Sequence, residues 1–263
     1  MSPPIAKPSG LTPEYAAQYQ DLSIVRAYRH REPYPEETFK ILAELARVPA
    51  PRVADLGCGT GDLTLGLCRF AGHVDAIDFS PAMIKEARHR ADEIENITWI
   101  ESSVESASLA TQYDLIAAAD SFHWLDWNVV FDRLGEWLKP NAYFTVVERE
   151  YAEKTWWTKQ LQEIINTFST NRSYQRYDLI EELRRTGRFK IAGDRWTAPV
   201  KFRQSAQDLV EAFHSRNGFS RDRMGTDQAA EFDAAAMEAL DKFARNGKLD
   251  LAVTARVTWG IAL

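Results

Sequence analysis

The chain of 263 residues carries 38 acidic and 32 basic side chains, which leave a formal net charge of −6. Apolar residues make up 45% and charged residues 27%, a balance typical of a globular protein and not of a disordered one. The acidic balance argues against broad affinity for nucleic acid, which needs clustered Lys and Arg. The length fits one large domain with a sizeable core.

The cysteine content and the ends of the chain indicate a compartment. Cys58 and Cys68 are too few for a disulfide framework or a four-ligand zinc site, and we expect no metal. The first residues lack the apolar run of a signal peptide, and no stretch of about 18 apolar residues occurs. We therefore expect a reduced, soluble, cytoplasmic protein with no membrane partner.

The N-terminal segment, residues 1–35, is predicted to be an arm and a lid helix. Its first dozen residues are rich in proline and predict a mobile arm. Thr12-Pro13-Glu14 has a hydroxyl cap, a proline at the first helical position and an acid in the first turn, which predicts a helix to about Ala27. Pro33 and Pro35 then interrupt the chain.

From residue 36 to 150, helical stretches alternate with short apolar runs. This alternation is typical of βαβ units, which form a parallel sheet with helices on both faces. We therefore predict a Rossmann-like core here. The predicted helices are 35–48, 62–70, 81–94 and 128–138, and the predicted strands are 53–56, 74–77, 97–100, 113–119 and 143–148.

The pattern loosens after residue 151, but no linker rich in glycine and serine marks a second independent domain. Residues 151–263 are therefore predicted to add cap helices and the last two strands of the same sheet, which makes a single domain overall. The predicted helices are 156–168, 178–186, 205–216 and 228–245, and the predicted extended segments are 189–202, with a break near Gly193, and 249–262.

The most informative segment is the turn after the first predicted strand, where Gly57, Gly59 and Gly61 alternate with other residues ahead of a helix. Glycine lets the backbone turn sharply and lets a ligand approach where a Cβ would collide. The third glycine comes one position earlier than in the dinucleotide pattern G-x-G-x-x-G. Asp55 and Asp62 flank the loop and oppose a pyrophosphate, which favours a nucleoside with an amino-acid tail over NAD.

Asp78 follows Gly57 by 21 residues and ends the next predicted strand. A carboxylate at this place accepts hydrogen bonds from a ribose diol. The alternative is that Asp78 only caps the following helix. Ser80 before Pro81 is the better cap, which weakens that alternative.

Several motifs resemble one family. The sequence DLGCGTG at residues 55–61 closely matches the first motif of the class I S-adenosylmethionine-dependent methyltransferases, and residues 78–83 resemble their second. Residues 122–127 and 138–141 are similar to the small-molecule branch that includes trans-aconitate and ubiquinone-pathway methyltransferases. Residues 30–35 are similar to an upstream Arg-Pro-x-Tyr-Pro element of that branch.

The resemblance implies an α/β fold: a Rossmann-like, doubly wound, mostly parallel seven-stranded sheet with helices on both faces and a helical cap. It implies a methyltransferase that uses S-adenosyl-L-methionine and moves the methyl group to an O, N or C atom of a small-molecule acceptor by in-line displacement. We expect a hydrophobic or anionic acceptor, and a monomer or homodimer. Two alternatives stay open: a methyltransferase of this fold acting on protein or nucleic acid, and a cofactor-binding protein without catalysis.

The resemblance also assigns roles to residues. It places Asp78 at the ribose hydroxyls, Phe79 against the adenine, the Val104 N–H near an adenine nitrogen, Arg31 near the cofactor carboxylate and Ala119 beside the sulfonium. The cofactor-binding residues that it implies are Arg31, Tyr34, Asp55, Gly57, Cys58, Gly59, Asp78, Phe79, Met83, Ser103, Val104, Ala119 and Asp120.

His123 is the leading candidate for a catalytic base, because it follows the fourth strand, where ligands bind in open α/β sheets. A base is needed only for a hydroxyl, a protonated amine or an acidic carbon. The alternative is that His123 and Trp124 line the cofactor or pack together. His30 and His214 are weaker candidates. Aromatic residues that could form an acceptor wall or only pack a cap are Tyr151, Trp156, Trp157, Phe168, Tyr174 and Tyr177.

Overall fold

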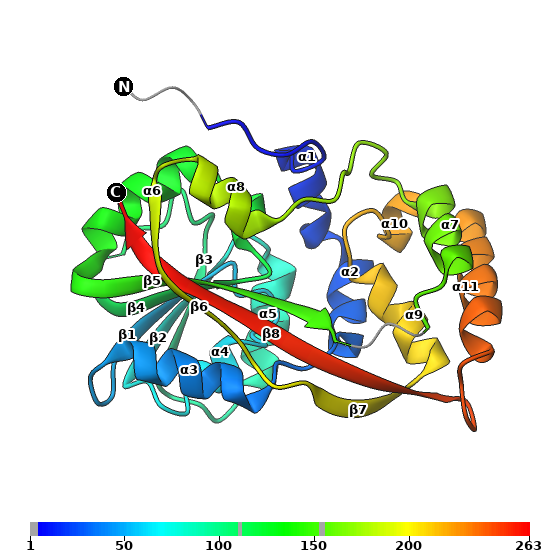
Figure 1. Ribbon diagram of the computed structural model, residues 1–263, viewed down its shortest axis with the longest axis horizontal. Coiled ribbons are helices and arrows are strands. Elements are labelled where there is room, and N and C mark those ends of the chain that lie inside the picture. The colour runs from blue at the N-terminus through cyan, green and yellow to red at the C-terminus, as the bar shows by residue number, and fades with distance from the viewer. Residues whose placement is uncertain (1–4, 110–111, 153–155) are drawn as a thin grey trace.

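A computed structural model describes residues 5–109, 112–152 and 156–263 (Figure 1). Its centre is a sheet with the strand order β3-β2-β1-β4-β5-β8-β6, and β7 also pairs with β8. The first five strands pair in parallel and the last three are antiparallel, which confirms a mostly parallel sheet. The strands are β1 (Arg52–Leu56), β2 (His73–Asp78), β3 (Ile97–Glu101), β4 (Tyr113–Ala119), β5 (Leu138–Tyr151), β6 (Phe189–Trp196), β7 (Val200–Ser205) and β8 (Lys248–Ala262).

The central strands are apolar throughout because both faces of the sheet are covered. Val53 and Leu115 pack on one face, whereas their neighbours Ala54 and Ile116 pack on the other. Successive side chains of a strand point to opposite faces, so a strand covered on both sides is continuously apolar. The helices α3 (Glu36–Ala46), α4 (Thr64–Leu67) and α5 (Pro81–Arg90) cover the first face, and α6 (Trp127–Trp137) and α8 (Leu179–Arg185) cover the second.

Two predicted helices differ from the structure. The helix predicted to run to Ala27 is interrupted at Asp21, whose backbone is extended and whose carboxylate accepts hydrogen bonds from Ser220 and Arg223. The helix predicted at 62–70 is reduced to the single turn α4. The arm instead consists of α1 (Pro13–Ala16), the 3₁₀ turn η1 (Ala17–Gln20), α2 (Leu22–Ala27) and the 3₁₀ turn η2 (Tyr28–His30).

The sheet has eight strands in the described residues, not the seven expected. The extended segment after α8 is divided by residues 197–199, including Pro199, into β6 and β7. Both pair with β8, which is long enough to hold β6 along residues 256–262 and β7 along residues 248–253. The predicted break at Gly193 is only a shift of register, where a Cβ would collide with the ring of Trp259.

A helical cap is confirmed beside the sheet and has a core of its own (Figure 1). Phe232 is fully buried there, with ring centroids of Phe213 and Phe219 at 6.0 and 5.0 Å. Trp156 and Phe168 belong to the same cluster, which supports packing as their role. The cap helices are α7 (Lys159–Phe168), α9 (Ala206–His214), α10 (Arg221–Met224) and α11 (Thr226–Asp241).

The described part of the proline-rich arm is packed and not free. The backbone N–H of Ile5 donates to Oδ1 of Asn128 at 2.9 Å, and Nζ of Lys7 donates to the carbonyl of Leu125 at 3.1 Å. The prediction of a mobile arm is therefore wrong for residues 5–11, while residues 1–4 lie outside the described residues. None of the helices described here has the length and apolar character needed to cross a membrane.

Candidate functional site

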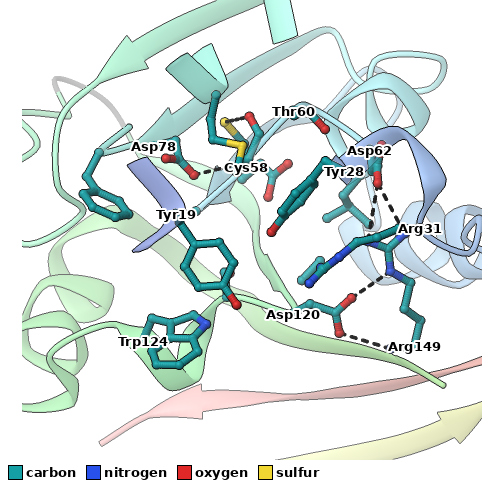
Figure 2. A pocket seen from close by; sticks show the side chains of 18 of the residues that line it. Tyr19, Tyr28, Arg31, Cys58, Thr60, Asp62, Asp78, Asp120, Trp124 and Arg149 are labelled. Atoms are coloured by element: carbon teal, nitrogen blue, oxygen red, sulfur yellow. Dashed lines mark hydrogen bonds and ion pairs between the residues drawn. The ribbon is translucent and has the colours of Figure 1, made fainter. Parts of the chain in front are cut away.

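A cleft lies at the carboxyl ends of β1, β2 and β4, beneath the arm (Figure 2). Ligands of open α/β sheets bind at this edge. Its empty volume, counted with the solvent at its open mouth, is about 670 Å³. Of the residues predicted to bind a cofactor, those that line it are Arg31, Tyr34, Asp55, Gly57, Cys58, Gly59, Asp78, Phe79, Met83, Ala119 and Asp120.

The glycine turn forms one wall of the cleft and needs its glycines. Gly57 and Gly59 have φ angles of 73° and 54°, in the left-handed region that favours glycine. A Cβ on Gly57 would collide with Ser121. A Cβ on Gly59 would stand 3.4 Å from the ring of Tyr28, inside the cleft. The turn therefore brings bare backbone close to any bound ligand.

Asp78 is a buried carboxylate that no cation neutralises in the part of the chain described. Its Oδ2 accepts a hydrogen bond from the Gly59 N–H at 2.8 Å, and its Oδ1 accepts one from the Ser80 N–H at 2.8 Å. Burial raises the pKa of Asp78 to about 6, and these two hydrogen bonds oppose the rise. Each oxygen keeps acceptor capacity, so two further donors would be favourable.

Asp55 lies behind the glycine turn. Its Oδ2 accepts a hydrogen bond of 2.6 Å from the hydroxyl of Thr64, and only 1% of the residue is exposed. Burial raises the pKa of Asp55 to about 7, with the nearby carboxylates of Asp78 and Asp62 adding to the rise. The base of the cleft therefore carries a carboxyl group that titrates near neutrality.

Arg149 is the main cleft residue that sequence analysis missed. Its Nε donates to Oδ2 of Asp120 at 2.8 Å, and its Nη1 lies 3.3 Å from Oδ2 of Asp62 (Figure 2). Its Nη1 also donates to the carbonyl of Glu32 at 2.6 Å. The guanidinium stacks over Tyr34 at 4.1 Å. The only signal for it in the sequence was an arginine directly after the predicted end of the fifth strand.

Asp120 stands in a backbone conformation that is uncommon for a residue with a side chain. Its φ is 50°, and its N–H donates to the carbonyl of Val147 at 2.9 Å. The hydroxyl of Tyr34 donates to Oδ2 at 3.1 Å, beside the bond from Arg149. Strained residues of this kind persist where surrounding contacts hold them, and they cluster at functional sites.

Aromatic rings from the arm and from the turn after β4 cover the cleft. The rings of Tyr19 and Trp124 lie 5.5 Å apart, and Tyr19 and Tyr28 meet edge to face at 6.4 Å (Figure 2). The guanidinium of Arg31 stacks on Tyr28 at 4.3 Å and donates to the hydroxyl and carbonyl of Ser215 at 2.9 and 3.1 Å. No described carboxylate lies within ion-pair distance of Arg31, so this partly buried cation is open to an anionic group.

Three predicted site residues lie outside the lining. Val104 is 2% exposed and packs in the core, and Ser103 Oγ accepts the Ser106 N–H at 3.2 Å. His123 packs against Trp124 and Tyr177, with ring centroids 4.9 and 6.5 Å away. Burial lowers the pKa of His123 to about 4, with Asp120 opposing the shift.

The other two histidine candidates have structural partners. His30 Nδ1 lies 2.9 Å from a carboxylate oxygen of Asp208. His214 is fully buried in the cap, with its ring nitrogens 2.7 Å from the carbonyl of Phe219 and 2.6 Å from Asp233. Across residues 5–109, 112–152 and 156–263, no group of three His, Cys, Asp or Glu side chains could hold a metal ion.

Part of the chain is similar in sequence to known methyltransferases. A family model described as a methyltransferase domain matches residues 53–141. A malonyl-acyl-carrier-protein O-methyltransferase of Anoxybacillus flavithermus is 37% identical over 79 residues, 29% of this chain and 30% of that protein. An uncharacterized methyltransferase of Mycobacterium tuberculosis is 31% identical over 144 residues, 54% of this chain and 57% of the relative. The matches thus span 30% and 57% of the length of these two relatives.

Solved structures show the same fold over nearly the whole chain. A putative type II methyltransferase from Anaeromyxobacter dehalogenans has a TM-score of 0.59 at 22% identity and covers 88% of this chain and 96% of its own. A structure of an S-adenosylmethionine-dependent methyltransferase from Thiobacillus denitrificans in complex with S-adenosyl-L-homocysteine has a TM-score of 0.53 at 16% identity. The match covers 91% of this chain and 97% of that one. Residues 53–141 are therefore similar to a methyltransferase domain, within a fold that these solved structures share.

Proposed function

We propose that the chain binds S-adenosylmethionine in this cleft and transfers its methyl group to a small-molecule acceptor. The observation that carries the proposal is Asp78, a buried carboxylate at the edge of the cleft, directly beside the bare backbone of Gly59 and with no cation paired to it where the structure is described. The 2′- and 3′-hydroxyls of a ribose are the two donors that such a carboxylate lacks.

The rest of the cleft fits the other parts of the donor. Phe79 and Met83 offer apolar surface for an adenine, beyond the carboxylate of Asp78. Tyr19, Tyr28 and Trp124 offer aromatic faces, which stabilise a nearby cation by about 0.5–2 kcal/mol each. When bound, S-adenosylmethionine supplies a methyl group made electrophilic by its sulfonium.

The chain contributes mainly by orientation. Holding an acceptor in line with the reacting methyl group can supply roughly 7–11 kcal/mol. Aromatic rings of the arm cover part of the cleft, which would limit the access of water to the reacting groups. We propose a hydrophobic or anionic acceptor, because aromatic rings line the cleft together with the guanidinium of Arg31, which has no carboxylate partner among the described residues.

Two runner-up functions share the fold. A methyltransferase acting on protein or nucleic acid would need an exposed docking surface, and the net charge of −6 opposes the phosphate backbone. A cofactor-binding protein without catalysis would bind the donor and leave all acceptors unmodified. The same fold also occurs in a [4+2]-cyclase, with a TM-score of 0.51 at 21% identity, so the fold by itself does not establish methyl transfer.

The test has two stages. Calorimetry should show binding of both S-adenosylmethionine and S-adenosylhomocysteine to the wild-type chain. A labelled-methyl assay over carboxylates, phenols, amines and acidic carbon compounds should then show transfer to one class. Failure to bind either compound contradicts the proposal. Binding without transfer to any small molecule, protein or nucleic acid favours the non-catalytic alternative.

A further inference from the structure

His214 is the last residue of α9, and both of its ring nitrogens face hydrogen-bond acceptors. Its side chain has no exposed surface. Nδ1 lies 2.7 Å from the carbonyl oxygen of Phe219, and Nε2 lies 2.6 Å from Oδ1 of Asp233 on α11. A carbonyl oxygen only accepts hydrogen bonds, so Nδ1 must carry a proton. Nε2 must carry one too if the carboxylate of Asp233 is ionised.

Asp233 is kept ionised by a cation on its other side. Nη2 of Arg221 lies 2.7 Å from Oδ2 of Asp233, and the same guanidinium also pairs with Glu211 at 2.7 Å. Burial alone would raise the pKa of Asp233, but the hydrogen bonds from His214 and Arg221 outweigh it and lower the pKa. Both nitrogens of His214 therefore donate, which makes the ring an imidazolium.

The other charged groups around α9 do not take the place of Asp233. This helix packs against α2, η2, β7 and α11. On these elements, the charged side chains other than Asp233 and His30 are exposed. His30 lies between the arm and the cap and pairs with Asp208 of α9 at 2.9 Å. His30 is therefore a second group whose titration can act on the contact between arm and cap.

Residues 215–223 form the loop that follows His214 and contacts the arm. The pairs between this loop and the arm include Ser215 with Arg31, Arg216 with Glu32, Gly218 with Gln18 and Ser220 with Asp21, at 2.7–2.9 Å. The arm residues Tyr19, Tyr28 and Arg31 line the cleft. The position of the loop therefore determines how the arm covers the cleft.

Loss of a proton from His214 would disturb this arrangement at the loop. One ring nitrogen would then present a lone pair to an oxygen 2.6–2.7 Å away, at a place with no exposed surface. A buried polar group without its hydrogen bond is unfavourable. Asp233 belongs to α11, a helix of 16 residues whose Phe232 is fully buried, whereas the Phe219 carbonyl belongs to the loop. The loop is therefore the side that moves.

We propose that His214, as an imidazolium, is a positioning residue that fixes the loop 215–223 and, through it, the arm over the cleft. Loss of its proton loosens the arm, so the covering of the cleft depends on pH. This inference goes beyond the proposed function, because it does not depend on which ligand the cleft binds.

The first measurement is the charge of His214. Nitrogen NMR of the full chain labelled with ¹⁵N-histidine distinguishes a ring with two protonated nitrogens from a neutral ring, which has one bare nitrogen. At pH 7.5, where a freely exposed histidine is mostly neutral, we expect two protonated nitrogens at His214. Asp233→Asn removes the carboxylate, should make this ring neutral, and so identifies its signals. A neutral His214 in the wild-type chain overturns the proposal.

The second measurement is amide hydrogen exchange in the arm, residues 18–32, between pH 6 and 9 after correction for the intrinsic exchange rate. In the wild-type chain the protection of these amides should fall as the pH rises. In His214→Gln it should be about tenfold lower than wild type at pH 6 and independent of pH, because a neutral amide cannot donate to both oxygens. A role in cap stability alone would lower protection in α11 and leave that of the arm unchanged.

Two further variants separate His214 from other groups. Asp233→Asn lets a neutral His214 accept from the amide and still donate to Phe219. Protection of the arm should therefore stay within about threefold of wild type at pH 6 and lose its pH dependence. His30→Gln is the matched control, and the pH dependence should persist in it.

The outcomes decide the proposal. A pH dependence that persists in His214→Gln or Asp233→Asn, or that disappears in His30→Gln, assigns the titration to another group and overturns it. Should His214→Gln not fold, Asp233→Asn decides alone: protection without pH dependence supports the proposal, and the wild-type dependence overturns it.

Discussion

Nη2 of Arg216 lies 2.9 Å from Oε1 and 2.8 Å from Oε2 of Glu32, so this ion pair ties the arm over the cleft to the cap. Glu32 is 2% exposed. Burial alone would raise the pKa of Glu32, but the guanidinium groups of Arg216, Arg149 and Arg31 outweigh it and lower the pKa to about 2. This pair is therefore a stabilising contact between segments 184 residues apart in the chain.

Replacing Glu32 by Gln should destabilise the chain, because Arg216 then loses its carboxylate. We expect a loss of about 2–3 kcal/mol in unfolding free energy, less than for a fully buried pair because the Arg216 side chain is 36% exposed. Urea unfolding at pH 7 measures it.

Glu36→Gln is the control for this prediction. Glu36 pairs with Arg69 at the surface, and losing that pair should cost less than about 1 kcal/mol. Equal losses in the two variants at pH 7 would contradict the importance of the buried pair.

The depressed pKa of Glu32 also makes its contribution to the unfolding free energy depend on pH. This contribution is present above the ordinary pKa of 4.5 and disappears as the pH falls towards 2.

Asp78→Ala should weaken the binding of S-adenosylhomocysteine by about 1.5–3 kcal/mol, which is the scale of lost charge-assisted hydrogen bonds. Calorimetry at pH 7.5 measures the loss. Glu101 is the matched control, since it stands beside Asp78 on β3, is exposed and does not line the cleft. An Asp78→Ala chain that binds like wild type would remove Asp78 from the ribose site.

The affinity for S-adenosylhomocysteine should depend on pH through Asp78. Burial raises the pKa of this carboxyl to about 6, and only its ionised form accepts from both ribose hydroxyls. Affinity should therefore rise between pH 5 and 7 and level off above. At pH 5 about a tenth of the groups are ionised, so we expect roughly tenfold weaker binding. Asp78→Ala should remove the slope, and a slope that persists in it would assign the titration to another group.

Asp55 should make the unliganded chain less stable as the pH rises. Its pKa is about 7 when folded, against an ordinary value of 3.8, so the folded chain keeps a proton that the unfolded chain releases. The stability from this group is complete below pH 4 and is lost as the pH rises through 7. As the pH rises from 5 to 8, the free energy of unfolding of Asp55→Asn should therefore increase by about 2–3 kcal/mol relative to that of the wild type.

Thermal unfolding at several pH values measures this gain, and the exposed Asp92→Asn serves as control. A difference between Asp55→Asn and wild type that does not change with pH would show that Asp55 has no raised pKa.

The parallel sheet, the glycine turn and the place of Asp78 could be predicted because each depends on residues close together in sequence. The break at Asp21 could not be predicted, since the arginine that binds the Asp21 carboxylate, Arg223, is 202 residues away. Arg149 reaches Glu32 across 117 residues, and no local pattern marks such a contact. Local sequence patterns therefore predicted the wall of the cleft that the strands form. They could not predict the wall that the arm forms, because that wall depends on polar contacts between residues far apart in the sequence.

His123 should act as a packing residue of the cleft. Burial lowers its pKa to about 4, so the imidazole is neutral from pH 6 to 8 and is a weak base there. Its ring supports Trp124, which lines the cleft. His123→Phe keeps a ring of similar size and should retain both S-adenosylhomocysteine affinity and methyl transfer within about threefold, whereas His123→Ala should weaken binding by about 1 kcal/mol.

Both quantities are measured on the same preparations, by calorimetry and by the labelled-methyl assay with the acceptor that the panel identifies. A general base gives the opposite pattern, because both substitutions would then lower turnover by about 10²–10⁴ with affinity for S-adenosylhomocysteine intact. The Phe variant decides between the roles, because it preserves the packing under Trp124 and removes the only nitrogen atoms that could take a proton at this position.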